Sequence, residues 1–141
     1  MKLYFGNFVG GNGALGLLIV RIVFGAGIML HGLGKIQHPF SWMGPGARMP
    51  AALQALAALS EFGGGLALML GLLVPLAMFG LVCTMAVAIF TVHIPRGDAF
   101  VARGSGGSFE LAALYLSVAL LMILLGPGTL SLDAKLFGKR R

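Results

Sequence analysis

The hydrophobic residues of this chain form long uninterrupted blocks. Four such blocks are separated by short segments rich in glycine, proline and charged residues. A soluble helix or strand spaces its apolar residues at the period of the element. An apolar stretch of about 20 residues, by contrast, is long enough to cross the hydrocarbon core of a bilayer. The pattern therefore predicts membrane-spanning segments joined by short connections.

The four blocks predict four transmembrane helices. These run over residues 14–37, 51–74, 76–94 and 109–125. Pro39 follows the first helix and Pro75 separates the second from the third so closely that the two must form an antiparallel hairpin. Only helices and closed barrels satisfy backbone hydrogen bonds in lipid, and the blocks lack the alternation of barrel strands. We expect an all-α fold, an antiparallel four-transmembrane-helix bundle that forms a single domain over residues 1–141.

Composition agrees with this membrane assignment. Hydrophobic residues make up 58% of the chain and charged residues 10%, whereas about a quarter of the residues in a soluble domain are charged. The net charge of +6 comes from basic residues that gather mainly at helix ends and the C-terminus. That distribution favours attraction to a membrane surface and gives no support to nucleic-acid binding. One cysteine excludes an intramolecular disulfide and a CxxC thiol relay.

Basic residues also predict the orientation. The first block contains Arg21 and lacks a small-residue cleavage site, so we interpret it as a retained span. Four spans place both termini on one side of the membrane. That side carries Lys2, Lys135, Lys139, Arg140 and Arg141, and the opposite loops carry Arg48, Arg96 and Arg103. The excess predicts cytoplasmic termini.

Several ionisable residues lie inside the predicted helices, where a charge costs roughly 2.5 to 3.5 kcal/mol. They are Arg21, His31, Glu61, His93 and Glu110, with Lys35 at a helix margin. The helical rise places Arg21 in the inner half of the membrane and the others toward the outer half. Helical spacing puts them on stripes that also hold small residues, such as Gln54, Glu61 and Gly65, or Glu110, Ala113 and Ser117. We expect these stripes to face inward and to form a polar pocket near the outer face.

Each of these residues has a structural alternative. Arg21 and Glu61 either form an ion pair that locks the first two helices or bind a ligand directly. His31 and His93 are more often packing residues than ligands of a metal or haem that bridges two helices, and no metal site is predicted. Trp42 lies in a segment that belongs to the membrane interface or caps the pocket. Small residues at every fourth position favour close helix packing.

Four segments in order resemble the DoxX family of bacterial membrane proteins. They read LIVRIVFGAGIMLHGLGKI, SEFGGGLALMLGLLVPLA, IFTVHIPRG and FELAALYLSVALLMILLGPGTLSLDA, and together they cover nearly the whole chain. DoxX-like proteins are similar to a small subunit of an archaeal thiosulfate:quinone oxidoreductase and are linked to redox and sulfur stress. The resemblance implies a four-helix fold in the bacterial inner membrane.

Together, the pocket and the resemblance lead us to expect a membrane subunit of a quinone-linked oxidoreductase or redox-stress system. In this scheme His31 and Glu61 are the catalytic pair that holds the quinone head and relays protons. The expected ligand-binding residues are Arg21, Lys35, His93 and Glu110, with Arg21 keeping Glu61 ionised. A quinone is the expected cofactor, with haem less favoured. Electrons would come from a bound cofactor or a partner subunit, and soluble redox proteins are expected partners.

A rival reading is non-enzymatic. The chain would then be a membrane scaffold that anchors soluble redox enzymes, or a small solute carrier. Because four helices enclose little volume, a carrier would need to form a homo-oligomer.

Overall fold

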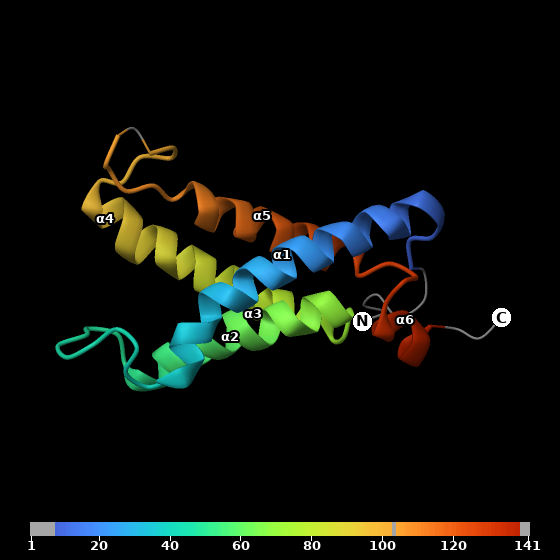
Figure 1. Ribbon diagram of the computed structural model, residues 1–141, viewed down its shortest axis with the longest axis horizontal. Helices are drawn as coiled ribbons and strands as arrows, with labels where there is room; N and C mark the ends of the chain where they lie inside the picture. The colour runs from blue at the N-terminus through green and yellow to red at the C-terminus, as the bar shows by residue number, and fades with distance from the viewer. Residues whose placement is uncertain (1–7, 103, 139–141) are drawn as a thin grey trace.

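The computed structural model describes residues 8–102 and 104–138, which form helices joined by turns and loops (Figure 1). The elements are α1 (Gly11–Gln37), α2 (Ala51–Leu70), α3 (Val74–Ala88), the π-helical segment η1 (Ile89–His93), α4 (Ile94–Arg96), α5 (Glu110–Leu125) and α6 (Leu132–Phe137). Five residues used in the orientation prediction lie outside the described residues: Lys2, Arg103, Lys139, Arg140 and Arg141.

Three helical rods are long and apolar enough to cross a membrane. They are Gly11–Gln37, Ala51–Leu70 and the continuous rod Val74–Arg96. Helix α5 is also apolar but has 16 residues, a length of about 24 Å against a hydrocarbon core of about 30 Å. The prediction of a helical protein that sits in a bilayer is confirmed. That α5 completes a four-helix transmembrane bundle stays a prediction.

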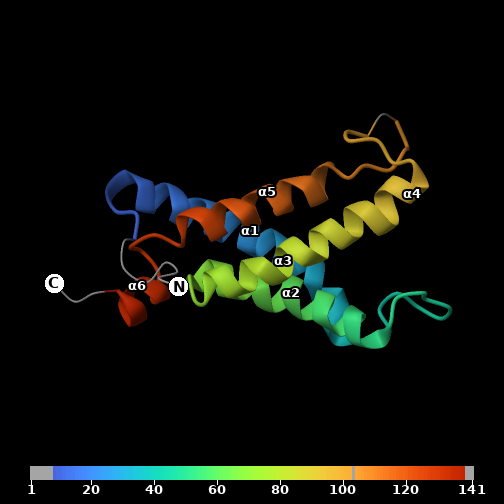
Figure 2. The ribbon, with the colours of Figure 1, turned by 180° about the vertical axis from the view of Figure 1, so that it is seen from behind.

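The helices are arranged around α3. Helix α1 packs along α2, and α3 packs against both α2 and α5, whereas α1 and α5 touch only slightly. The connections 38–50 and 97–109 lie together at what we call the loop end (left in Figure 1). Helix α6, the turn between α2 and α3 and the start of α1 lie at the opposite, termini end, and Figure 2 shows the same arrangement from behind.

The turn between α2 and α3 lies earlier than the sequence predicts. Helix α2 ends at Leu70 because Gly71 adopts the left-handed conformation with φ 66°, a common way to end a helix. Leu73 is also left-handed with φ 48°, which is costly for a residue with a Cβ. Pro75 then lies in the first turn of α3, where its missing N–H costs nothing. The predicted antiparallel hairpin is confirmed, with a shorter second helix.

Asp133 holds this turn in place. Its carboxylate accepts hydrogen bonds from the backbone N–H groups of Leu73 at 2.7 Å and Val74 at 3.0 Å. Its own N–H donates to the carbonyl of Gly71 at 2.8 Å. The carboxylate therefore satisfies two orphan donors at the start of α3 and complements the helix dipole there. Asp133 thereby ties α6 to the hairpin and stabilises the left-handed Leu73.

Helices α1 and α2 approach closely through glycines. A Cβ on Gly65 would lie 2.6 Å from the carbonyl oxygen of Gly25, and one on Gly32 would overlap the backbone of Phe62. Small residues thus bring membrane helices together, as predicted. A Cβ on Gly63 of α2 would instead meet the side chain of Leu59 in its own helix.

The inward face of α5 differs from the predicted one. Ser117 is exposed and its hydroxyl donates to the carbonyl of Leu114 in the same helix. The buried positions are Ala112, Tyr115, Ala119 and Met122. The prediction that Glu110, Ala113 and Ser117 face inward is therefore wrong for Ser117, whereas Glu110 and Ala113 are partly buried and Ala113 packs against the core. The bulkier neighbouring face, with Tyr115 and Met122, fills the space against α3.

Candidate functional site

Arg21 is fully buried and is bonded to main-chain carbonyls. Its Nε donates to Leu68 O at 2.9 Å and its Nη2 to Met69 O at 3.0 Å. Its Nη1 donates to Pro127 O and Leu130 O, both at 2.8 Å. Two of these carbonyls belong to the last turn of α2, where the regular intrahelical donors run out, although Leu68 O also accepts from Gly71 N at 3.1 Å. Arg21 thus joins α1, α2 and the segment after α5 at the termini end.

The predicted ion pair between Arg21 and Glu61 is wrong. Glu61 pairs with Lys35 instead, and the distance from Lys35 Nζ to Glu61 Oε1 is 2.6 Å. The Glu61 side chain is 4% exposed and the Lys35 side chain 28%. Lys35 comes from the last turn of α1 and Glu61 from the middle of α2. Lys35, and not Arg21, is therefore the cation that pairs with Glu61, since Arg21 donates to backbone carbonyls.

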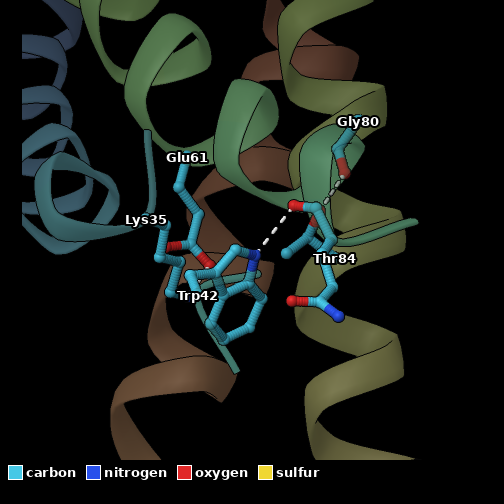
Figure 3. A network of polar contacts seen from close by, with 6 residues as sticks. Lys35, Trp42, Glu61, Gly80 and Thr84 are labelled. Atoms are coloured by element: carbon cyan, nitrogen blue, oxygen red, sulfur yellow. Dashed lines mark hydrogen bonds and ion pairs between the residues drawn. The ribbon is translucent and has the colours of Figure 1, made fainter. Parts of the chain in front are cut away.

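Trp42 covers this ion pair from the loop end. The Lys35 ammonium lies 4.6 Å from the centroid of the indole ring, within cation–π range. The indole N–H donates to the carbonyl of Gln54 at 2.9 Å, and the Gln54 side chain in turn bonds Met43 N and Met49 O. Figure 3 shows Lys35, Glu61 and Trp42 converging beside Thr84 of α3. The geometry favours the interpretation that Trp42 caps the pocket over the one that places it at the membrane interface.

One oxygen of Glu61 has no hydrogen-bond partner among the described residues. Lys35 occupies Oε1, and Oε2 is buried with no donor in reach. An unsatisfied buried acceptor costs about 1 to 3 kcal/mol, and more when it is charged. Such an atom marks a position at which a donor from a ligand, a water or an added proton would be stabilised.

A first cavity of about 340 Å³ lies between α2, α3 and the 38–50 connection. Its walls are mostly apolar and include Trp42, Leu53, Leu56, Phe79 and Val87. Lys35 and Glu61 are its charged residues. This volume falls in the range of small-molecule sites, which are typically apolar with a few convergent polar groups.

A second cavity of about 230 Å³ lies on the other side of the ion pair, between α1, α5 and the end of the α3–η1 rod. Its walls are mixed: His31, His93, Ser108 and Tyr115 contribute polar groups, and Ile28, Met85 and Leu111 contribute apolar ones. The His31 and Tyr115 rings meet edge to face with centroids 5.9 Å apart. Lys35, Glu61 and Ala88 line both cavities. The ion pair thus separates an apolar cavity from a more polar one.

His93 has a carboxylate partner that the sequence prediction does not include. Its Nδ1 lies 2.7 Å from Asp98 Oδ2. Asp98 lies in the connection after α4, a segment that the sequence pattern marks only as polar and glycine-rich. Tyr115 is also absent from the predicted set, although a hydroxyl inside an apolar block is a usable signal.

The structure therefore brings together four of the six predicted site residues. His31, Lys35, Glu61 and His93 all line the second cavity. Arg21 and Glu110 line neither cavity. Among the described residues, no group of three or more His, Cys, Asp or Glu is arranged to hold a metal ion.

These features define a helical membrane protein with a lysine–glutamate pair enclosed between two cavities. Residues 16–94 match the DoxX family, and the chain belongs to that family, as the sequence segments predict. The matched region contains Lys35, Glu61 and His93, whereas Tyr115 lies beyond it. The chain is also 34% identical over 125 residues to an uncharacterized protein of Haemophilus influenzae, covering 87% of this chain and 92% of that protein. No solved structure matches the chain.

Proposed function

We propose that this chain is the membrane subunit of a quinone-linked redox system and that it holds the quinone head at Lys35 and Glu61. The observation that carries the proposal is the unpartnered Oε2 of Glu61, buried beside a lysine in the wall of an apolar cavity. The family resemblance to a quinone oxidoreductase subunit agrees with it. The site would lie in the bacterial inner membrane, with cytoplasmic termini and the loop end outside.

The ion pair has the right groups for both redox forms of a quinone. A quinone carbonyl accepts hydrogen bonds, and the Lys35 ammonium has donors beyond the one used by Glu61. A quinol hydroxyl donates, and Glu61 Oε2 is the acceptor without a donor. Leu53, Leu56 and Phe79 form apolar walls for the ring, and the cavity opens between α2 and α3, where a lipid-soluble molecule arrives from the bilayer.

Reduction of the quinone takes two electrons and two protons and yields the quinol. In this proposal a two-electron donor on a soluble redox partner supplies the electrons. The membrane chain binds the quinone and supplies the protons, with Glu61 and His31 as the relay residues. Arg21 and Glu110 have no part in this site, because they line neither cavity.

Trp42 makes binding directly measurable, since it is the chain's one tryptophan and it lines the first cavity. A short-tailed ubiquinone analogue, decylubiquinone, should quench its fluorescence in a saturable way. Lys35→Met and Glu61→Gln should each weaken the apparent affinity by about 10-fold to 100-fold, as expected for the loss of a hydrogen bond to a charged group. Lys135→Met, which changes an exposed lysine of α6, is the matched control and should titrate like the unmodified protein.

The double variant Lys35→Met with Glu61→Gln is a control for misfolding of the single variants, because it leaves no unpaired buried charge. It should fold as well as the unmodified protein and still bind quinone weakly. Equal quenching in all variants would show simple partitioning of quinone into the detergent or lipid, and would contradict the site. In that case, copurification of a soluble redox enzyme would favour the scaffold alternative.

A further inference from the structure

We propose that the second cavity is a hydrated proton path from the loop end to Glu61, and that the His93–Asp98 pair accepts the proton at the outer end of this path. The use made of the proton rests on the proposed quinone site. The path itself is a property of the second cavity and can be tested without a quinone.

The cavity has the composition that a proton path requires. Its polar residues come from separate parts of the fold: His31 and Lys35 from α1, Glu61 from α2, His93 from η1, Ser108 from the connection before α5, and Tyr115 from α5. Its volume of about 230 Å³ has room for several waters, each of which takes about 30 Å³ in the liquid. Glu61 lines the same space and carries a buried oxygen without a donor among the described residues. One cavity therefore joins a free carboxylate oxygen to a histidine of the loop end.

A π-helical turn places His93 in this cavity. Two turns of a regular α-helix take about seven residues, so Val92 would lie above Met85, which lines the second cavity. In η1 the N–H of Ile94 bonds the carbonyl of Ile89, five residues back, and this wider turn adds one residue. Val92 accordingly lines the first cavity and His93 takes the place above Met85 in the second. Pro95 favours the irregular turn because it has no N–H to continue the regular ladder.

Asp98 determines which nitrogen of His93 can exchange protons with the cavity. Its carboxylate lies 2.7 Å from Nδ1, so it accepts the Nδ1 proton and leaves Nε2 as the second ring nitrogen. A proton from the aqueous phase forms an N–H bond at Nε2, and the Asp98 charge stabilises the resulting imidazolium. When that bond breaks, water molecules in the cavity carry the proton to Glu61 Oε2, where it forms an O–H bond. Lys35, His31 and Tyr115 are the other titratable groups that line the cavity.

Infrared spectroscopy can follow this transfer, because a carboxyl group gives a C=O stretching band, separate from the amide bands, only when it is protonated. After rapid acidification of the full-length protein, the Glu61 band is identified by its loss in Glu61→Gln. His93→Gln and Asp98→Asn should slow the appearance of this band by about 100-fold, the lower end of the range for a positioned acid–base group. His38→Gln is the matched control, since His38 is an exposed histidine of the loop end that lines neither cavity, and it should leave the rate unchanged.

A second variant separates loss of the relay from loss of fold. In His93→Ala, added imidazole should restore much of the lost rate, which a misfolded cavity would not allow. Unchanged kinetics in both His93→Gln and Asp98→Asn, or no recovery with imidazole, would overturn the path. This readout contains no quinone, so its failure is distinguishable from failure of the Trp42 titration.

Discussion

Replacing Arg21 with methionine is expected to destabilise the protein more than any other single substitution considered. Four carbonyl groups lose their donor at once. They connect the end of α2 to the segment after α5, deep inside the fold. A hydrogen bond to a charged group contributes about 1.5 to 3 kcal/mol, so the loss of several at once is a large share of the stability of a small protein. Arg21→Lys should also destabilise, because a single ammonium cannot reproduce the planar fork of donors.

Thermal unfolding of the purified protein measures this effect. Arg48→Met, at an exposed arginine of the 38–50 connection, is the matched control and should unfold like the unmodified protein. The double variant Arg21→Met with Glu61→Gln distinguishes the observed bonding from the ion pair that the sequence suggests. If Arg21 paired with Glu61, the second substitution would restore stability. We expect no restoration, and a double variant as stable as Arg48→Met would contradict the assignment.

Gly32→Ala is the second substitution with a large expected effect. The added Cβ would overlap the backbone nitrogen of Phe62 and lie 2.9 Å from the carbonyl carbon of Glu61. Because backbone atoms cannot move aside as a flexible side chain can, α1 must shift away from α2. Overpacking of this kind costs about 1 to 3 kcal/mol. The shift would also separate Lys35 from Glu61, since these residues lie on the same two helices.

Gly34→Ala provides a control of opposite sign on the same helix. A Cβ at Gly34 would have no neighbouring atom within 4 Å. Replacing a helical glycine by alanine there should stabilise the protein by up to about 1 kcal/mol. Melting temperature and Trp42 quenching by decylubiquinone should both fall in Gly32→Ala and be retained in Gly34→Ala. Equal behaviour of the two variants would contradict the close α1–α2 contact.

The helices were predictable because the bilayer restricts the chain so strongly. Long apolar blocks in lipid must be helical, and the position of Pro75 defines the hairpin. Other features have no simple sequence signal. The partners of Arg21 are main-chain carbonyls, which every residue has, and Asp133 acts through backbone N–H groups contributed by a distant turn. Helix α6 is short, with two charged residues among its six, so its pattern resembles that of a tail.

Most residues of the site could be predicted from the sequence, but which of them form the ion pair could not. An Arg21–Glu61 pair is one of the two expected arrangements because both residues are charged and lie inside the first two helices, whereas Lys35 is placed at a helix margin. The close glycine contact between α1 and α2 brings the Lys35 ammonium to Glu61. On α5, the stripe of Ser117 and the stripe of Tyr115 have the same period, so only packing against α3 selects between them. The π turn that moves His93 is likewise a product of local packing.

Photolabelling with an azido-ubiquinone tests the central claim most directly, that the Lys35–Glu61 pair holds a quinone in the first cavity. The reagent should label residues of that cavity, Trp42, Leu53 and Cys83 among them. Excess decylubiquinone should abolish this labelling, and the double variant Lys35→Met with Glu61→Gln should strongly reduce it. Label spread over exposed outward positions such as Leu30 and Leu124, unaffected by competitor or by the double variant, would contradict it.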